Sequence, residues 1–332
     1  MSAQREAMGP HDVGGDFNET RAIDTVDHGM THWEQHANAL RMVITGKDLG
    51  TLDEMRRAAE DLGQRYNEIG YFEKQTEAFV IVMIERGVVT REEVDGKIEE
   101  IAARFDVPTI PLPEVKADGH SHDHDHDHDH DHPVYKEDDT GGRPNEHHLM
   151  NLAMQDLLIA QGRITADEVR QMIERFDADF PKRGAKVVAK AWADPEFKAR
   201  LLADACPTIE AEMGFDEPFQ AGLIAVENTQ DVHNVIVCTL CSCYPRYLLG
   251  QPPTWYKSRA YRSRMVHEPR TVLKEFGTEI ADDVKIRVHD SNADMRYFVI
   301  PMQPKGTEGW SEEQLEAIIN RDSLVGITLP KA

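Results

Sequence analysis

Residues 234–246, "NVIVCTLCSCYPR", bring three of the chain's four cysteines into six consecutive positions. Closely spaced thiolates bind soft or borderline metal ions, so Cys238, Cys241 and Cys243 indicate a metal centre. The β-branched run before them predicts a strand, with the cysteines in a tight loop at its end. Because so few bonds separate the sulfurs, the backbone must lie against the metal, and the amide nitrogens of Ser242 and Cys243 become candidate ligands. Such a donor set suits a low-spin trivalent ion that acts as a Lewis acid.

Three other interpretations of the cluster stay open. A structural zinc site needs a fourth ligand, which Cys206 or His233 would have to supply, because no second C-x-x-C occurs. A redox C-x-x-C pair lacks the βαβ pattern of thioredoxin-like domains. Three buried, inert cysteines are disfavoured by their clustering.

Length, composition and charge exclude several classes of protein. The chain has 332 residues, of which 40% are hydrophobic, and this is enough for a sizeable core. Its formal net charge of -23 disfavours nucleic-acid binding, which needs a basic face. The first residues lack the apolar run of a signal peptide, and no window approaches the roughly 18 apolar residues of a membrane span. We therefore expect a cytoplasmic protein with no membrane partner.

A His/Asp-rich stretch divides the chain. Residues 116–146 contain an alternation of His and Asp from His120 to His132 and end in a Gly-Gly pair followed by polar residues. This composition predicts a flexible, solvated linker and three segments, 1–110, 111–146 and 147–332. Neutral imidazoles at alternate positions also chelate divalent ions, so a cobalt-binding or cobalt-delivery protein is a non-enzymatic alternative.

The segments on either side of the linker differ in their predicted secondary structure. The first predicts three to four helices and no sheet, with capping boxes at Thr51/Glu54 and Thr90/Glu93. The third begins in the same way, with a capping box at Thr165/Glu168. From about Phe219 it becomes rich in β-branched residues, and strands are expected at 221–229, 233–240, 285–291 and 295–302. The predicted fold class is α+β, with strands flanking the cysteine cluster.

Four stretches in the last segment carry a family resemblance. They are "VCTLCSC" (237–243), "LGQPPTWYKSRAYRSRMVHEPRTVLKEFG" (249–277), "IRVHDSNADMRYFVIPMQPKGTEGW" (286–310) and "RDSLVGITLP" (321–330). From about residue 147 onward the chain resembles the α subunit of nitrile hydratases and the γ subunit of thiocyanate hydrolase. Thr239 resembles the cobalt-type motif, whereas the iron type usually carries serine there. The resemblance implies a low-spin cobalt(III) centre in preference to iron.

The first segment resembles the N-terminal helical half of the β subunit of the same family. The matching stretches are "HDVGG" (11–15), "LDEMRRAAEDLG" (52–63) and "GYFEKQTEAFVIVMIERGVVTREEV" (70–94). The small β-barrel that follows this half in the family is missing here. The resemblance therefore implies fused β-like and α-like segments, a separate barrel subunit as partner and a heteromeric assembly. An activator or cobalt chaperone is a further possible partner.

The resemblance implies roles for the residues of the cysteine loop. Cys238, Cys241 and Cys243 supply sulfur ligands, and the amides of Ser242 and Cys243 complete the equatorial plane. Cys241 becomes a sulfinic acid and Cys243 a sulfenic acid, both of which are accessible steps of thiol oxidation. Oxidised sulfurs in a dry site need a guanidinium nearby, and Arg56 matches the β-subunit arginine that provides it.

Two more residues match the family only approximately. Tyr71 matches, with a one-residue gap, a tyrosine that reaches the serine of the loop. Gln220 lies close to a glutamine that holds water near the metal, although the loop lengths differ by one residue. Without these matches, Arg56 is a solvated helix charge and Tyr71 a core aromatic residue.

The implied reaction is hydration of a carbon–nitrogen triple bond, in which the metal polarises the nitrile and an oxygen nucleophile attacks carbon. The nucleophile is either the Cys243 sulfenate or an activated water. Arg246 departs from the nitrile hydratase pattern and favours thiocyanate hydrolase, because most nitrile hydratases have tryptophan at this position and thiocyanate hydrolase has arginine. Met55 favours nitrile hydratase, because thiocyanate hydrolase has a second arginine at that position and nitrile hydratases have an apolar residue. The prediction is a nitrile hydratase, with thiocyanate hydrolysis to carbonyl sulfide and ammonia as the alternative.

Overall fold

The structure is a computed structural model of the chain. It describes residues 9, 11–14, 18–107, 144–178, 180–215, 221–240 and 243–332, without the side chains of residues 176–182. Two compact units form: a helical unit, His28–Glu174, and a mixed unit made of Met1–Asp27 and Arg175–Ala332. The His/Asp stretch lies outside the described residues. The division into 1–110, 111–146 and 147–332 concerns family segments rather than compactness, and it stays a prediction.

The described residues before the His/Asp stretch form five helices where three to four were expected; one of them, α3, is a single turn. Each capping box predicted from the sequence forms, at Thr51, Thr90 and Thr165. A further box at Thr31 opens the first helix and was not predicted. The helices of this unit are α1 (His32–Gly46), α2 (Leu52–Glu60), α3 (Arg65–Glu68), α4 (Tyr71–Glu85), α5 (Arg91–Phe105), α6 (Glu146–Ala160) and α7 (Ala166–Ala178), the last of which crosses the unit boundary.

A buried carboxylate joins α3, α4 and α6. Glu77 is 0% exposed, and it accepts hydrogen bonds from Arg65 Nε at 2.9 Å and from His147 Nε2 at 2.9 Å. Burial alone would raise the pKa of Glu77, but the bonds from His147 and Arg65 outweigh it and hold the pKa below its ordinary value. An ionised carboxylate therefore links the segments on either side of the His/Asp stretch.

All four strands predicted from the sequence are present, in the mixed unit. They are β1 (Gly222–Glu227), β2 (Val232–Val237), β3 (Lys285–Asp290) and β4 (Met295–Ile300). The pairing is parallel and crossed, since β1 pairs with β4 and β2 pairs with β3. The register places Asp290 opposite Val237, the residue that precedes Cys238. The α+β expectation therefore holds in outline.

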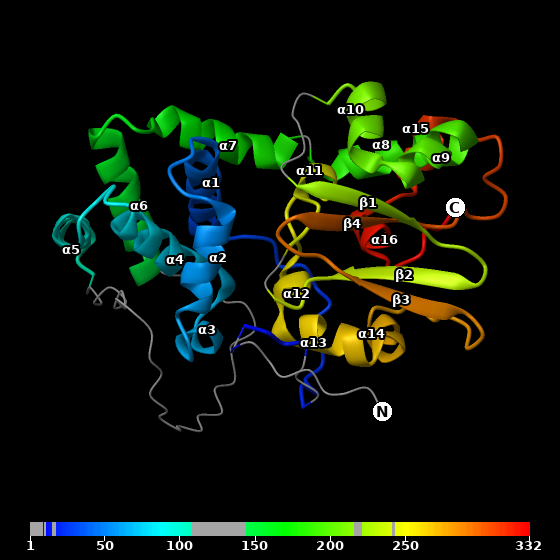
Figure 1. Cartoon of the computed structure of the whole chain (residues 1–332), viewed down its shortest axis with the longest axis horizontal. Coiled ribbons are helices and arrows are strands. Elements are labelled where there is room, and N and C mark those ends of the chain that lie inside the picture. Colours follow the sequence, from blue (N-terminus) through cyan, green and yellow to red (C-terminus); the bar gives the residue numbers. More distant parts are fainter. Residues whose placement is uncertain are drawn as a thin grey trace. The chain divides into compact units, whose positions relative to one another are not determined.

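Helices cover both sides of these strands (Figure 1). In that view α8, α9, α10 and α15 lie beyond β1, while α13 and α14 lie beyond β3. The helices of the mixed unit are α8 (Phe180–Ala193), α9 (Pro195–Ala203), α10 (Ala205–Met213), α11 (Arg246–Leu249), α12 (Thr254–Lys257), α13 (Arg259–His267), α14 (Pro269–Glu275), α15 (Glu312–Ala317) and α16 (Arg321–Val325). Among the described residues, no helix combines the length and apolar character needed to cross a bilayer.

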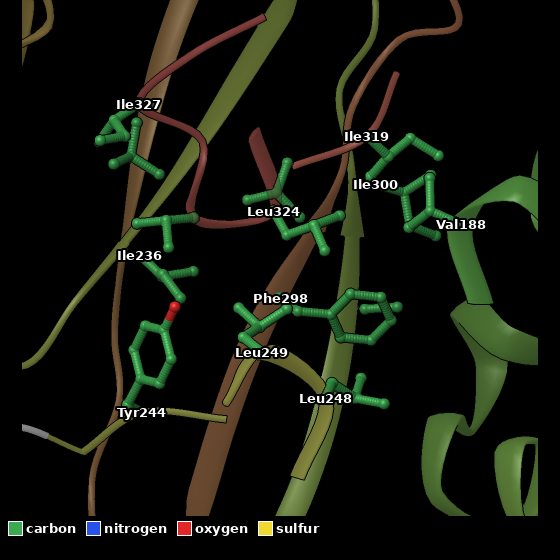
Figure 2. Packing of buried hydrophobic residues seen from close by; sticks show 14 of the residues in the cluster. Val188, Ile236, Tyr244, Leu248, Leu249, Phe298, Ile300, Ile319, Leu324 and Ile327 are labelled. Atoms are coloured by element: carbon green, nitrogen blue, oxygen red, sulfur yellow. The ribbon is translucent and has the colours of Figure 1, made fainter. Parts of the chain in front are cut away.

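The core of the mixed unit gathers side chains from distant parts of the chain. Figure 2 shows Ile236 of β2 and Phe298 of β4 packed among Leu248, Leu249 and Leu324. The last helix reaches this core through Gly326, whose φ is +90°. A Cβ on Gly326 would lie 2.1 Å from the backbone oxygen of Asn234, so only glycine allows this approach. The core thus fixes β2, the strand that leads into the cysteine loop.

Candidate metal centre

Cys238 and Cys243 mark the two ends of the cysteine loop. Cys238 directly follows β2 and is 0% exposed, and Cys243 is 7% exposed. Neither forms a disulfide among the described residues. Cys241 and Ser242 lie outside those residues, so two members of the predicted ligand set have no described geometry. The predicted position of the loop at the end of a strand is confirmed for Cys238.

A buried guanidinium holds the first peptides of the loop. Arg262 of α13 is 5% exposed. Its Nε donates to the carbonyl oxygen of Cys238 at 3.0 Å, and its Nη2 donates to the carbonyl oxygen of Thr239 at 2.9 Å. A planar guanidinium presents several donors in fixed directions, so the side chain of Arg262 sets the orientation of two successive peptides.

Asp290 holds the same region from the neighbouring strand. Its carboxylate accepts the amide of Thr239 at 2.9 Å and the hydroxyl of Thr239 at 2.6 Å. Asp290 as a residue is exposed, but the protein around its carboxyl group displaces water and raises the pKa of that carboxyl; the charge of Cys238 adds to the rise, and the two bonds from Thr239 oppose it. The parallel pairing of β2 with β3 is what brings this carboxylate to the start of the loop.

Two buried tyrosines complete the support. The hydroxyl of Tyr256 donates to the carbonyl oxygen of Cys243 at 2.9 Å, and that of Tyr261 donates to the carbonyl oxygen of Ile236 at 2.7 Å. Burial raises the pKa of Tyr256 well above its ordinary value, and the charges of Cys238 and Cys243 contribute to the rise. The backbone is therefore held at both ends of the loop, at Ile236 before Cys238 and at Cys243.

The arrangement fits a thiolate-bound metal. Two buried thiols lie at the two ends of the loop, where the backbone of Cys238, Thr239 and Cys243 is hydrogen-bonded, and such sulfur donors favour borderline and soft ions. Within the described part of the chain, no group of three or more His, Cys, Asp or Glu side chains is arranged to hold a metal ion. A complete site here requires Cys241.

The two residues named as a fourth zinc ligand are engaged elsewhere. His233 uses both ring nitrogens in the core: Nε2 lies 2.7 Å from the carbonyl oxygen of Gly326, and Nδ1 lies 3.1 Å from Nδ2 of Asn228. Cys206 belongs to α10, and its sulfur lies 3.9 Å from the carbonyl oxygen of Ala221. The structure thus offers no support for a zinc site completed by His233.

Of the other predicted site residues, three belong to the helical unit and only Arg246 lies near the cysteine loop in sequence. Arg56 forms an ion pair with Glu60 at 3.4 Å within α2. Tyr71 begins α4, and its ring packs edge-on against Phe72. The placement of the remaining predicted residues is as follows: Met55 is 1% exposed in the helical unit, Arg246 begins α11, and Gln220 lies outside the described residues.

The supporting residues Arg262, Asp290, Tyr256 and Tyr261 were not predicted from the sequence. The stretch "WYKSRAYR", residues 255–262, carries a usable signal, because it places tyrosine and arginine where a buried helix would have aliphatic residues. Buried side chains of these types require hydrogen-bond partners. The signal predicts such partners without identifying them as the carbonyls of the cysteine loop.

Comparison with known proteins matches two families to successive parts of the chain. The family described as "Nitrile hydratase, alpha chain" matches residues 145–328. The chain belongs to this family. The family described as "Nitrile hydratase beta subunit, N-terminal" matches residues 8–130. The fusion of a β-type segment with an α-type segment is therefore confirmed.

Individual relatives cover slightly more than half of the chain. Nitrile hydratase subunit alpha from Rhodococcus sp is 50% identical over 177 residues, which are 53% of this chain and 88% of that protein. The low-molecular weight cobalt-containing nitrile hydratase subunit alpha from Rhodococcus rhodochrous is 49% identical over 179 residues, 54% of this chain and 86% of that protein. Thiocyanate hydrolase subunit gamma from Thiobacillus thioparus is 41% identical over 197 residues, 56% of this chain and 81% of that protein.

The similar solved structures include both nitrile hydratases and thiocyanate hydrolase. A double mutant of the Fe-type nitrile hydratase from Comamonas testosteroni Ni1 superposes with a TM-score of 0.52 and 43% identity, covering 54% of this chain and 88% of its own. A recombinant thiocyanate hydrolase comprising partially modified cobalt centres gives a TM-score of 0.52 and 38% identity, covering 57% and 91%. The mixed fold is therefore that of the nitrile hydratase α type.

Proposed function

We propose that this chain is the metal-binding subunit of a nitrile hydratase, which hydrates a nitrile to an amide at a non-corrin cobalt(III) centre. The observation that carries the proposal is the cysteine loop, in which Cys238 and Cys243 are withdrawn from water and the adjoining peptides are held from α12, α13 and β3. A fixed donor set in a dry site stabilises charge without reorganisation during the reaction. Bound cobalt(III) would supply the Lewis acidity that polarises the carbon–nitrogen bond.

The chain's own residues divide the remaining work. Cys238, Cys241 and Cys243 hold the ion through sulfur, and the amides of Ser242 and Cys243 through nitrogen. Arg262 and Asp290 orient the backbone of Cys238 and Thr239 at the start of the loop, and Tyr256 holds the carbonyl oxygen of Cys243 at its end. These bonds use side chains that a thiolate-bound metal would not displace.

The remaining predicted residues have further proposed roles. Arg56 provides positive charge for the oxidised sulfurs of Cys241 and Cys243, and Tyr71 orients Ser242. Gln220 holds the water that adds to the substrate carbon, and Met55 belongs to the substrate side of the site. Each assignment rests on the family resemblance of the residue concerned.

A separate small β-barrel subunit is the proposed partner, because the β-type match is to the N-terminal family alone. It would complete the heteromeric enzyme, and an activator or cobalt chaperone would load the metal. Cobalt is preferred to iron because of Thr239 and because cobalt-containing nitrile hydratases are among the relatives. The Fe-type structure of 43% identity makes metal analysis part of any test.

One observation favours thiocyanate hydrolysis as the second candidate. Arg246 begins α11, three residues after Cys243, and its side chain is only half-buried. A cation at this point in the chain suits an anionic substrate such as thiocyanate. The relative from Thiobacillus thioparus supports the same alternative.

The test is metal analysis of the purified chain, co-expressed with a barrel partner, followed by product assays on acrylonitrile and thiocyanate in parallel. We expect about one cobalt ion per chain and release of amide. Release of carbonyl sulfide and ammonia from thiocyanate alone would replace the first function by the second. Cys243→Ser should abolish cobalt binding, whereas the matched control Cys206→Ser should retain it. Zinc in the wild-type chain, with neither product, would refute both functions.

The His/Asp stretch gives a third, non-enzymatic candidate, cobalt delivery. Deletion of residues 120–132 tests it in metal-limited cells. Equal cobalt occupancy of the cysteine loop with and without this stretch would favour a spacer. Lower occupancy without it would indicate cobalt capture as an added function.

A further inference from the structure

We propose that the N-terminal arm, residues 11–14, is a positioning element of the cysteine loop and acts together with Arg262 to fix the peptide of Thr239. The inference rests on the proposed function and deepens it, because it names what holds the metal ligands in place. The arm belongs to the β-type segment, whereas the loop belongs to the α-type segment. Both lie in the mixed unit.

The backbone of the arm meets the loop directly. The amide of Val13 donates to the carbonyl oxygen of Thr239 at 3.3 Å. The same oxygen accepts Nη2 of Arg262 at 2.9 Å, and that Nη2 also lies 3.1 Å from the carbonyl oxygen of His11. Arg262 therefore links the backbone of His11 to that of Thr239, about 230 residues away in sequence. The arm takes part in two bonds: the carbonyl oxygen of His11 accepts from Arg262, and the amide of Val13 donates to Thr239.

Close packing accompanies these bonds. A Cβ on Gly14 would lie 3.2 Å from Cβ of Thr239 and 3.3 Å from its Oγ1. The arm is itself ordered by Asp12, whose carboxylate accepts the amide of Gly14 at 3.2 Å. His11, Asp12 and Val13 are all buried. The side chain of Thr239 is thus covered by the arm on one side and bonded to Asp290 through its hydroxyl.

The segment that follows the arm, residues 21–27, is anchored independently of the loop. The amide of Ile23 donates to Glu275 at 3.0 Å, and Arg264 donates to the carbonyl oxygen of Arg21 at 2.8 Å. The amide of Thr254 donates to Asp27 at 3.0 Å. Residues 21–27 therefore tie the chain to α12, α13 and α14 whether or not residues 11–14 are in place. Residues 11–14 can consequently be removed without releasing residues 21–27 from the mixed unit.

These contacts matter for the metal ligands because of where Thr239 lies in the loop. Thr239 lies between Cys238 and Cys241, so its peptide sets the path from the first sulfur to the second. Loss of the arm removes one hydrogen bond and one packing face from this peptide, while Arg262 and Asp290 remain. We expect the start of the loop to open locally, with the rest of the mixed unit unchanged.

Gly14→Val and a deletion of residues 1–14 test the inference in the full remaining chain. Gly46→Val is the matched control, because a Cβ on Gly46 meets nothing within 4 Å. The first readout is the alkylation rate of each cysteine in the metal-free protein, measured by mass spectrometry. Cys206 serves as the internal reference, since it lies in α10, away from the loop in sequence. We expect both arm variants to raise the Cys238 rate at least about tenfold, with the Cys206 rate unchanged.

The second readout is spectroscopic. In cobalt-loaded protein, the arm variants should shift the thiolate-to-cobalt charge-transfer band and lower cobalt content, whereas the Gly46→Val protein should match wild type. Unchanged Cys238 alkylation and an unchanged band in both arm variants would overturn the inference. If deletion raises the Cys206 rate as well, Gly14→Ala decides in its place. A wild-type chain that binds no cobalt refutes the proposed function, and the alkylation rates then still decide the inference.

Discussion

Replacement of Arg262 by methionine should destabilise the mixed unit by about 4 kcal/mol. The substitution removes hydrogen bonds from a charged donor to the carbonyl oxygens of Cys238, Thr239 and His11. Hydrogen bonds to charged groups contribute roughly 1.5–3 kcal/mol each, and three at the lower limit give about 4.5 kcal/mol. Methionine fills a similar volume and avoids the desolvation of a buried cation, which offsets a small part of the loss.

Urea denaturation followed by tryptophan fluorescence measures this effect, because Trp255 packs against Tyr256 and Tyr261 in the same region. With a slope of about 2 kcal/mol per molar urea, a loss of about 4 kcal/mol lowers the midpoint by roughly 2 M. Arg287→Met is the matched control: Arg287 is exposed on β3, and its replacement should change stability by less than about 0.5 kcal/mol.

Arg262→Lys separates charge from geometry. A lysine keeps the positive charge but lacks the planar fork, so it should recover about a third of the lost stability. A loss of less than about 1 kcal/mol for Arg262→Met would refute the view that this guanidinium holds the loop. Full recovery by lysine would show that charge alone matters, with no role for the divergent donors.

Three further predictions concern other parts of the chain. Glu77→Gln should destabilise the helical unit by about 3 kcal/mol, because it removes the charge of a buried carboxylate that accepts bonds from His147 and from the partly exposed Arg65. The folded-state pKa of Glu77 is lowered, so its contribution to stability is present above the unfolded-state pKa and is lost as pH falls below about 4.5. Urea midpoints measured at pH 7 and pH 4 test both statements. Burial lowers the pKa of His233, so the mixed unit should lose stability as pH falls below about 6.5, and His233→Gln should flatten the slope between pH 8 and pH 5.5. Arg246→Trp should raise activity on neutral nitriles and abolish any activity on thiocyanate; unchanged selectivity would contradict its proposed role.

Local features of this chain were predictable because their causes lie within a few residues. The capping boxes at Thr51, Thr90 and Thr165 require only a hydroxyl and a carboxylate three positions apart, and all three form. The four strands follow from β-branched runs bounded by polar turns. The loop position of Cys238 follows in turn from the strand before it.

Features that depend on distant parts of the chain were not predictable in this way. Nothing local in the sequence says that β1 pairs with β4 and β2 with β3, so the approach of Asp290 to Thr239 could not be derived. The hydrogen-bond partners of Arg262 could not be predicted either, because they are backbone carbonyl oxygens, which every residue carries. The predicted roles of Arg56, Tyr71, Arg246, Met55 and Gln220 stay predictions.

The fused architecture changes how the arm meets the loop. If the arm belonged to a separate polypeptide, its contact with Thr239 would depend on association between two chains. Here residues 21–27 are hydrogen-bonded to the rest of the mixed unit. The arm, residues 11–14, therefore stays close to the loop, at an effective concentration of about millimolar or higher. Covering of Thr239 is then an intramolecular equilibrium, and alkylation of Cys238 in the metal-free chain should not depend on protein concentration. The start of the loop, at Cys238 and Thr239, is consequently held by contacts within this chain alone, and in the function proposed above no barrel partner is needed to form them.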